Sequence, residues 1–261
     1  MVLEKLISLR AAVRNPWMMF VVGGIVSIAC LIVSFLVFGD SVGMFTTFLI
    51  TVAMAPFMAN LLTYEEATTE DEIAARKNMN ILQRHVDMLK VYSAFFVGMI
   101  LALSLIFIML PADVIEHIFE DQIREIEIIR GGFLNMTILE RIIVNNISVL
   151  LITFLFSFLF GAGAVFILSW NASVLATAIG LAAKAIGGVK GLPMAVMIFF
   201  PHGSLEILAY FIGAIAGGIV SAAVTRDRSR YFWPVIEDSM KFLIIAIVFL
   251  VFAGFIEAAQ L

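Results

Sequence analysis

Long apolar stretches alternate with short polar ones along most of this chain. Several of them reach the roughly 20 apolar residues that an α-helix needs to cross a bilayer, and none alternates as a membrane-spanning strand does. The pattern predicts an all-α fold, a polytopic helical membrane bundle with six to seven crossings, built as a single domain over residues 1–261. The apolar stretches cover residues 16–38, 42–62, 91–110, 142–170, 205–224 and 242–255.

Composition indicates a membrane protein rather than a soluble one. Hydrophobic residues make up 62% of the chain and the mean hydropathy is +1.09, whereas ordinary soluble domains are about 45–50% apolar. The first apolar stretch is too long for a cleavable signal peptide, so we expect it to be retained as an anchor. The single cysteine, Cys30, cannot form a disulfide within one chain. The lipid bilayer is the expected surrounding, and we expect no nucleic-acid partner.

The distribution of Lys and Arg predicts the orientation of the bundle. With the N-terminus in the cytoplasm, eleven of the 16 Lys and Arg residues fall on the cytoplasmic side and three fall outside, within an acidic loop. Lys184 and Lys190 are not assigned to either side. We therefore expect a multi-pass protein of the plasma membrane with a cytoplasmic N-terminus.

This orientation requires two crossings between Trp170 and Arg226, although only residues 205–224 form an uninterrupted span. Residues 172–200 would supply the other crossing, and they are interrupted at Gly187, Gly188, Gly191 and Pro193. Irregular backbone at membrane depth is tolerated where it is buried in protein or lines a cavity, so we expect one broken helix here. The alternative is a re-entrant hairpin, which would move the arginines after residue 225 to the outside.

Two polar segments are predicted to form amphipathic connector helices. In the cytoplasmic segment, residues 64–90, Thr69 and Glu72 have the spacing of a capping box that starts a helix. In the outer segment, residues 111–137, we expect a helix over residues 113–129. Each can lie on the membrane surface or pack on the bundle; alternatively, the outer one binds a partner. Its acidic residues are Asp113, Glu116, Glu120, Asp121, Glu125 and Glu127.

The sequence PHGSLE at residues 201–206 places two ionisable residues, His202 and Glu206, in otherwise apolar surroundings. A charge buried in hydrocarbon costs about 2.5 kcal/mol or more, so such a residue usually faces a partner, a cavity or a pathway. A spacing of four puts both residues on one helix face, which Tyr210 continues. The alternative is structural, because Pro201 suits a first helical turn and Glu206 would stabilise a helix start.

Three asparagines are candidate partners for this pair. A helix beginning at Thr137 and ending at Trp170 would be about 50 Å long at about 1.5 Å per residue, which would place Asn145 and Asn146 near the outer interface. Adjacent helical residues point about 100° apart, so only one of the two can face a given groove; either could instead join helices by a hydrogen bond. Asn171 would follow the end of this helix, where asparagine tolerates the left-handed conformation of a helix cap.

Small residues recur every four positions after the ionisable pair, at Ala209, Gly213, Gly217 and Ser221. A face of small residues lets two helices approach closely. We expect this face to pack either within the chain or across a homodimer.

No enzyme signature accompanies the ionisable pair. His202 and Glu206 supply two ligands, whereas zinc requires at least three from the protein, and His85 and His117 are predicted on opposite sides of the membrane. The chain lacks the metalloprotease motif, the G-x-S-x-G nucleophile motif and a phosphate-binding loop. We therefore expect no catalytic activity, no metal and no cofactor, and we rank an intramembrane metalloenzyme last.

Together these residues resemble the stage II sporulation protein M family. The similarity covers residues 138–225, where the most specific feature is the P-H-G-x-x-E block followed by a glycine-rich helix. The resemblance implies a multi-pass membrane protein without known catalytic activity, whose namesake looks like a scaffold for peptidoglycan-remodelling enzymes. The positions that match the family motif are Asn145, Asn146, Asn171, His202 and Glu206.

Two functions follow as hypotheses. In the first, the chain is a conduit or carrier for an ion or small solute, in which Glu206 binds a cation, His202 gates or shares a proton, and Tyr210 orients them with an asparagine. In the second, the polar cluster only stabilises the fold, and the acidic outer segment recruits an envelope protein to a non-catalytic scaffold.

Overall fold

The computed structural model describes residues 8–74, 81–131, 137–225 and 232–260. Within these ranges seven helices are long and apolar enough to cross a membrane, which confirms the predicted helical bundle. They are α3 (Trp17–Val37), α4 (Val42–Ala74), α6 (Val86–Met109), α9 (Ile138–Phe160), α10 (Ala164–Ile186), α11 (Leu192–Thr225) and α12 (Phe232–Ala258). The connecting elements are α2 (Leu9–Arg14), α5 (Ile81–Arg84), α7 (Ala112–Ile118), α8 (Glu120–Gly131) and the 3-10 turn η1 (Gly188–Gly191).

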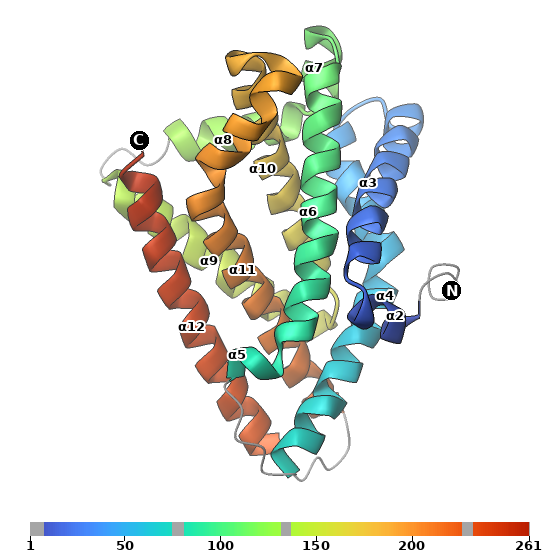
Figure 1. Ribbon diagram of the computed structural model, residues 1–261, viewed down its shortest axis with the longest axis vertical. Coiled ribbons are helices and arrows are strands. Elements are labelled where there is room, and N and C mark those ends of the chain that lie inside the picture. The colour runs from blue at the N-terminus through green and yellow to red at the C-terminus, as the bar shows by residue number, and fades with distance from the viewer. Residues whose placement is uncertain (1–7, 75–80, 132–136, 226–231, 261) are drawn as a thin grey trace.

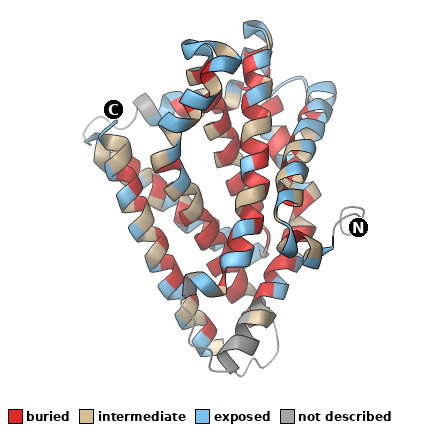
Figure 2. Cartoon of the chain, viewed as in Figure 1, coloured by how far each residue is buried: buried red, intermediate tan, exposed pale blue. Residues whose placement is uncertain are grey.

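Helices α6 and α11 run through the middle of the bundle, with α3 and α12 on opposite flanks (Figure 1). Helix α11 packs against α4, α6, α9, α10 and α12. Buried residues are concentrated on the central helices, whereas the flanking helices keep exposed apolar faces (Figure 2). Such outward apolar faces are what contact with lipid requires, so burial and hydropathy agree on a membrane location.

The long helix expected from Thr137 to Trp170 is two helices. Its start is as predicted, because Thr137 and Glu140 form a capping box. Helix α9 then ends at Phe160, since Gly161 adopts φ 60°, a conformation that glycine tolerates and other residues rarely adopt. Helix α10 begins at Ala164, so Asn171 lies inside a helix rather than at its cap.

Glycines also interrupt the chain between residues 172 and 200, but the interruption separates two helices. Residues up to Ile186 complete α10, Gly187 and Gly188 take positive φ, and α11 begins at Leu192. Helix α11 is 34 residues long and continues through Pro201 without a break. Pro201 therefore does not lie in a first turn, and the interpretation of Glu206 as a residue that stabilises a helix start is wrong.

Both connector predictions need new boundaries. Thr69 does not begin a helix, because α4 runs without a break to Ala74. The single outer helix expected over residues 113–129 is divided into α7 and α8 at Phe119. Phe119 is buried against Phe107, with ring centroids 5.1 Å apart. The helix is therefore interrupted at the residue whose side chain packs into the core.

Small residues bring helices together at two interfaces. Between α3 and α6, a Cβ atom at Gly23 would meet the backbone carbonyl of Phe95, and one at Gly98 would meet that of Phe20. Between α9 and α11, a Cβ atom at Gly213 would lie 2.6 Å from a methyl of Leu150. The ladder on α11 is therefore used within the chain, against α9.

Candidate functional site

The predicted polar residues of α9 and α11 meet in one hydrogen-bonded cluster. The Nδ2 atom of Asn146 donates to Oε1 of Glu206 at 2.6 Å. The hydroxyl of Tyr210 donates to Oδ1 of the same asparagine at 3.1 Å. Asn146 thus uses both ends of its amide to join a carboxylate and a phenol that lie one turn apart on α11.

The two adjacent asparagines have different roles, as their angular separation predicts. Asn146 is buried and faces α11, whereas Asn145 is half-buried. Nδ2 of Asn145 also donates to Oδ1 of Asn146, at 3.2 Å. Asn145 therefore orients the central asparagine and contributes no direct contact with Glu206 among the described hydrogen bonds.

Glu257 is a member of this cluster that the sequence interpretation missed. It lies one residue before the end of α12, which packs against α9 and α11, and its charge acts on the Glu206 carboxyl. The sequence contained a signal, since Glu257 is an ionisable residue at the end of an otherwise apolar stretch. Its pairing depends on how α12 packs against α11, which the local pattern does not show.

Two of the predicted site residues lie apart from these hydrogen bonds. Nδ2 of Asn171 donates to the Ile167 carbonyl one turn earlier in α10, at 2.8 Å. His202 lies one turn before Glu206 on α11, with an exposed fraction of 7%. Its Nδ1 atom is buried and has no hydrogen-bond partner in the part of the chain described, while its ring contacts Phe199 at a centroid distance of 5.8 Å.

The polar cluster lies near the end of the bundle at which α9 begins and α12 ends. Asn146 is about 12 Å along α9 from Ile138, and Glu206 is about 21 Å along α11 from Leu192, at about 1.5 Å per residue. Beyond the cluster the two helices are in close contact, because Gly217 packs on the backbone of Phe154. Ser157 adds a hydrogen bond from its hydroxyl to the Ala214 carbonyl, at 2.5 Å.

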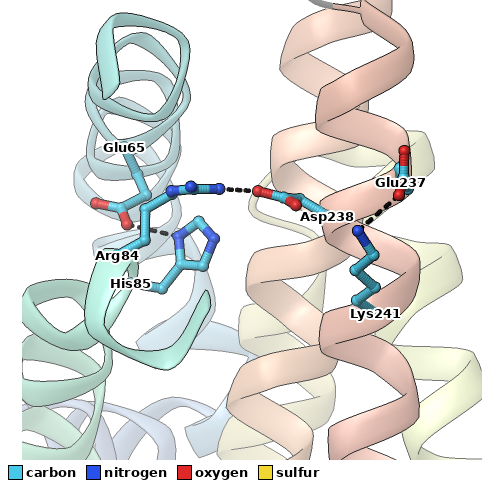
Figure 3. A network of polar contacts seen from close by, with 6 residues as sticks. All are labelled: Glu65, Arg84, His85, Glu237, Asp238 and Lys241. Carbon is cyan, nitrogen blue, oxygen red and sulfur yellow. Dashed lines mark hydrogen bonds and ion pairs between the residues drawn. The ribbon is translucent and has the colours of Figure 1, made fainter. Parts of the chain in front are cut away.

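A second polar cluster lies where α4, α5, α6 and α12 meet (Figure 3). Nδ1 of His85 lies 2.7 Å from Oε1 of Glu65, and both side chains are buried, with exposed fractions of 2% and 5% for the residues. The neighbouring Arg84 forms an ion pair with Asp238 of α12. The His85 ring also packs on Phe242 of α12, 4.9 Å between centroids. Tertiary structure thus gives His85 a partner that the sequence interpretation did not identify.

An acidic groove of about 590 Å³ lies on α7 and α8, at the opposite end of α6 from His85. Its ionisable residues include one histidine and one arginine among four carboxylates. His117 and His85 are separated by the whole of α6, as predicted. Within the described ranges, no three His, Cys, Asp or Glu residues gather as metal ligands. The groove is lined by Asp113, Glu116, His117, Glu120, Ile123, Arg124 and Glu127.

Comparison with known families confirms the resemblance that the P-H-G-x-x-E block suggests. The family model described as Stage II sporulation protein M matches residues 44–259 of this chain. The chain belongs to this family. The match extends well beyond residues 138–225 and includes α4 and α6, so both polar clusters fall within it. No curated protein and no solved structure matches the chain.

Membership of the stage II sporulation protein M family, with seven apolar helices, establishes a multi-pass membrane protein. Of the positions that carry the family motif, Asn145, Asn146 and Glu206 meet in the polar cluster. His202 follows one helical turn away, and Asn171 is bonded within α10. Tyr210 and Glu257, which the motif does not include, complete the cluster.

Proposed function

We propose that this chain is a membrane carrier for a small cation and that Glu206 is the group that binds it. The observation that carries the proposal is the position of Glu206 between three apolar helices, bonded to Asn146 of α9 and close to Glu257 of α12. Ionisable residues at membrane depth usually serve a pathway. Tyr210 and Asn145 act through Asn146 and orient the carboxylate.

The packing beside the site favours a carrier over an open conduit. The contacts of Gly213 with Leu150 and of Gly217 with Phe154 close the interface between α9 and α11. A hydrated ion cannot pass such an interface unless the helices separate. Release on the far side would therefore require a change in helix packing, which is typical of carriers.

The test is cation flux in proteoliposomes, with the parent chain compared with the Glu206→Gln variant. Glutamine keeps the side-chain volume and can still accept the Asn146 hydrogen bond, so the fold is expected to survive while the charge is lost. We expect most of the flux to disappear. The matched control is Glu116→Gln, which removes an exposed carboxylate of α7 and is expected to leave flux unchanged.

A non-catalytic scaffold is the second candidate function, and the acidic groove on α7 and α8 favours it because a basic segment of an envelope protein would fit its charge. The same experiment separates the two functions. A folded parent chain that moves none of the cations tested overturns the carrier proposal and leaves the scaffold. Flux that is equal in the parent and in Glu206→Gln removes Glu206 from its assigned role.

A further inference from the structure

The short helix α2 precedes α3 and is held against the bundle by its apolar side. Ser8 caps its start, because the Ser8 hydroxyl accepts a hydrogen bond from the Ala11 amide at 3.2 Å. Ala12 is completely buried, and Leu9 and Val13 also pack against the core. The helix contacts α3, α4 and α6. These contacts fix which side of α2 faces the protein and which side faces its surroundings.

The outward side of α2 carries two arginines. Arg10 and Arg14 are exposed. Because they are four residues apart in one helix, they lie on the same face, about 6 Å apart along the helix axis. Within the described ranges, no hydrogen bond or ion pair engages either guanidinium. By contrast, Lys90 of α6 is paired with Asp87. Two neighbouring positive charges of α2 are therefore available to an anion from outside the chain.

The position of α2 places these arginines at the level of the lipid headgroups. The candidate membrane span α3 begins at Trp17, and most of its residues are not buried inside the protein, so lipid has to cover them. Trp17 itself is 73% exposed, and tryptophan is enriched where headgroups meet hydrocarbon. Figure 1 shows α2 beside the end of α3 at which that helix begins, on the outside of the bundle.

From this arrangement we infer that Arg10, Arg14 and the adjacent Trp17 form a basic surface that binds the headgroups of anionic phospholipids. A guanidinium can donate two parallel hydrogen bonds to phosphate oxygens, so a phosphate group fits the two arginines. A lipid is favoured over a soluble phosphate, because Trp17 and the exposed apolar side of α3 would contact the acyl chains of the same molecule. Bound lipid would hold α2 and the start of α3 at the membrane surface.

This inference is independent of the carrier proposal. The basic surface also lies outside residues 44–259, the range that matches the family model. It is therefore a property of this chain that membership of the family does not imply. Basic residues close to an anionic membrane surface each contribute about a fivefold increase in binding, so two arginines are sufficient for a measurable preference.

The experiment uses Trp17 as a reporter of the lipid beside it. Trp170→Phe and Trp233→Phe leave Trp17 as the only tryptophan of the chain. The protein is reconstituted in phosphatidylcholine that contains a small fraction of either brominated phosphatidylglycerol or brominated phosphatidylcholine, because bromine quenches tryptophan fluorescence at short range. We expect stronger quenching by the brominated phosphatidylglycerol. This preference should fall about fivefold for each of the two arginines that is replaced by glutamine.

Two matched variants separate this surface from general charge effects. Arg10→Lys/Arg14→Lys retains both charges and should retain most of the preference. Lys90→Gln/Lys241→Gln removes the same number of charges, but from side chains that are paired with carboxylates, and should leave the preference unchanged. Monodisperse chromatography of each variant is the check on folding.

Three outcomes overturn the inference. Equal quenching of the parent chain by the two brominated lipids excludes an anionic lipid and leaves an acidic protein segment as the occupant. A preference that survives in Arg10→Gln/Arg14→Gln places the lipid elsewhere. A preference that inorganic phosphate abolishes, while sodium chloride of equal ionic strength does not, assigns the two arginines to a soluble phosphate instead.

Discussion

At the scale of single residues, some buried polar side chains in this protein form pairs that connect different helices. Glu65 and His85 are the clearest example outside the candidate site, because both are almost fully buried and bond only 2.7 Å apart. Removing one member of a buried pair leaves the other without compensation, whereas replacing both by apolar residues is often tolerated.

We therefore expect Glu65→Leu to lower the free energy of unfolding by about 3–5 kcal/mol. The double variant Glu65→Leu/His85→Phe should be less destabilised than the single variant, because it buries no unpaired polar group. Thermal unfolding in detergent measures both. The exposed pair of Lys90 and Asp87 provides the control, since Lys90→Gln should change stability by no more than about 1 kcal/mol. A double variant less stable than Glu65→Leu would contradict this explanation.

At the scale of helices, close packing at glycine determines which elements lie next to each other. Gly23 of α3 and Gly98 of α6 each contact the backbone of the opposite helix. Gly24, the next residue of α3, points into a less crowded space, where a Cβ atom would have Gly98 O as its nearest neighbour at 3.7 Å. The two neighbouring glycines therefore differ in packing while sharing the same helix and the same helix propensity.

Gly23→Ala is expected to force α3 and α6 apart and to destabilise the bundle by about 1–3 kcal/mol. Gly24→Ala should be neutral or slightly stabilising, because alanine favours the helix and meets no clash. Chemical or thermal unfolding of the two variants side by side gives the comparison. Equal stability of both would show that the helices do not pack as closely as described.

At the scale of the whole molecule, we expect the seven apolar helices of the described ranges all to cross the membrane, which would place the start of α3 and the end of α12 on opposite sides. The structure also locates the two lysines that charge alone left unassigned. Lys184 donates to the Leu110 carbonyl at the end of α6, at 2.6 Å, and Lys190 lies in η1 close by in sequence. Both lysines therefore lie at the end of the bundle that carries the acidic helices α7 and α8. The opposite end still carries the larger share of the Lys and Arg residues.

We predict a cytoplasmic N-terminus and an external C-terminus, because cytoplasmic loops carry the larger share of Lys and Arg. Alkaline phosphatase, which is active only outside the cytoplasm, should be active when fused after Leu261. Fusions at residues 77 and 228 should be inactive, since both connections carry clusters of arginine or lysine. Activity at residue 228 together with inactivity after Leu261 would invert the predicted orientation.

The amino-acid sequence by itself determined the class of fold and the ionisable residues of α11, and it limited the number of crossings to six or seven. These features depend on composition and on spacing along one helix, which a local pattern records directly. The break after α9 was not predicted, and only the positive φ of Gly161 in the structure shows that the helix ends there.

Tertiary structure alone decided which polar groups meet. Asn146 and Glu206 are 60 residues apart in the chain, and Glu257 joins them from a third helix. Glu65 of α4 and His85 at the start of α6 also form a pair, and the sequence between them does not predict it. Such contacts depend on the rotation and depth of each helix against its neighbours. Side-chain packing over the whole bundle sets these quantities, and hydropathy along a single helix does not.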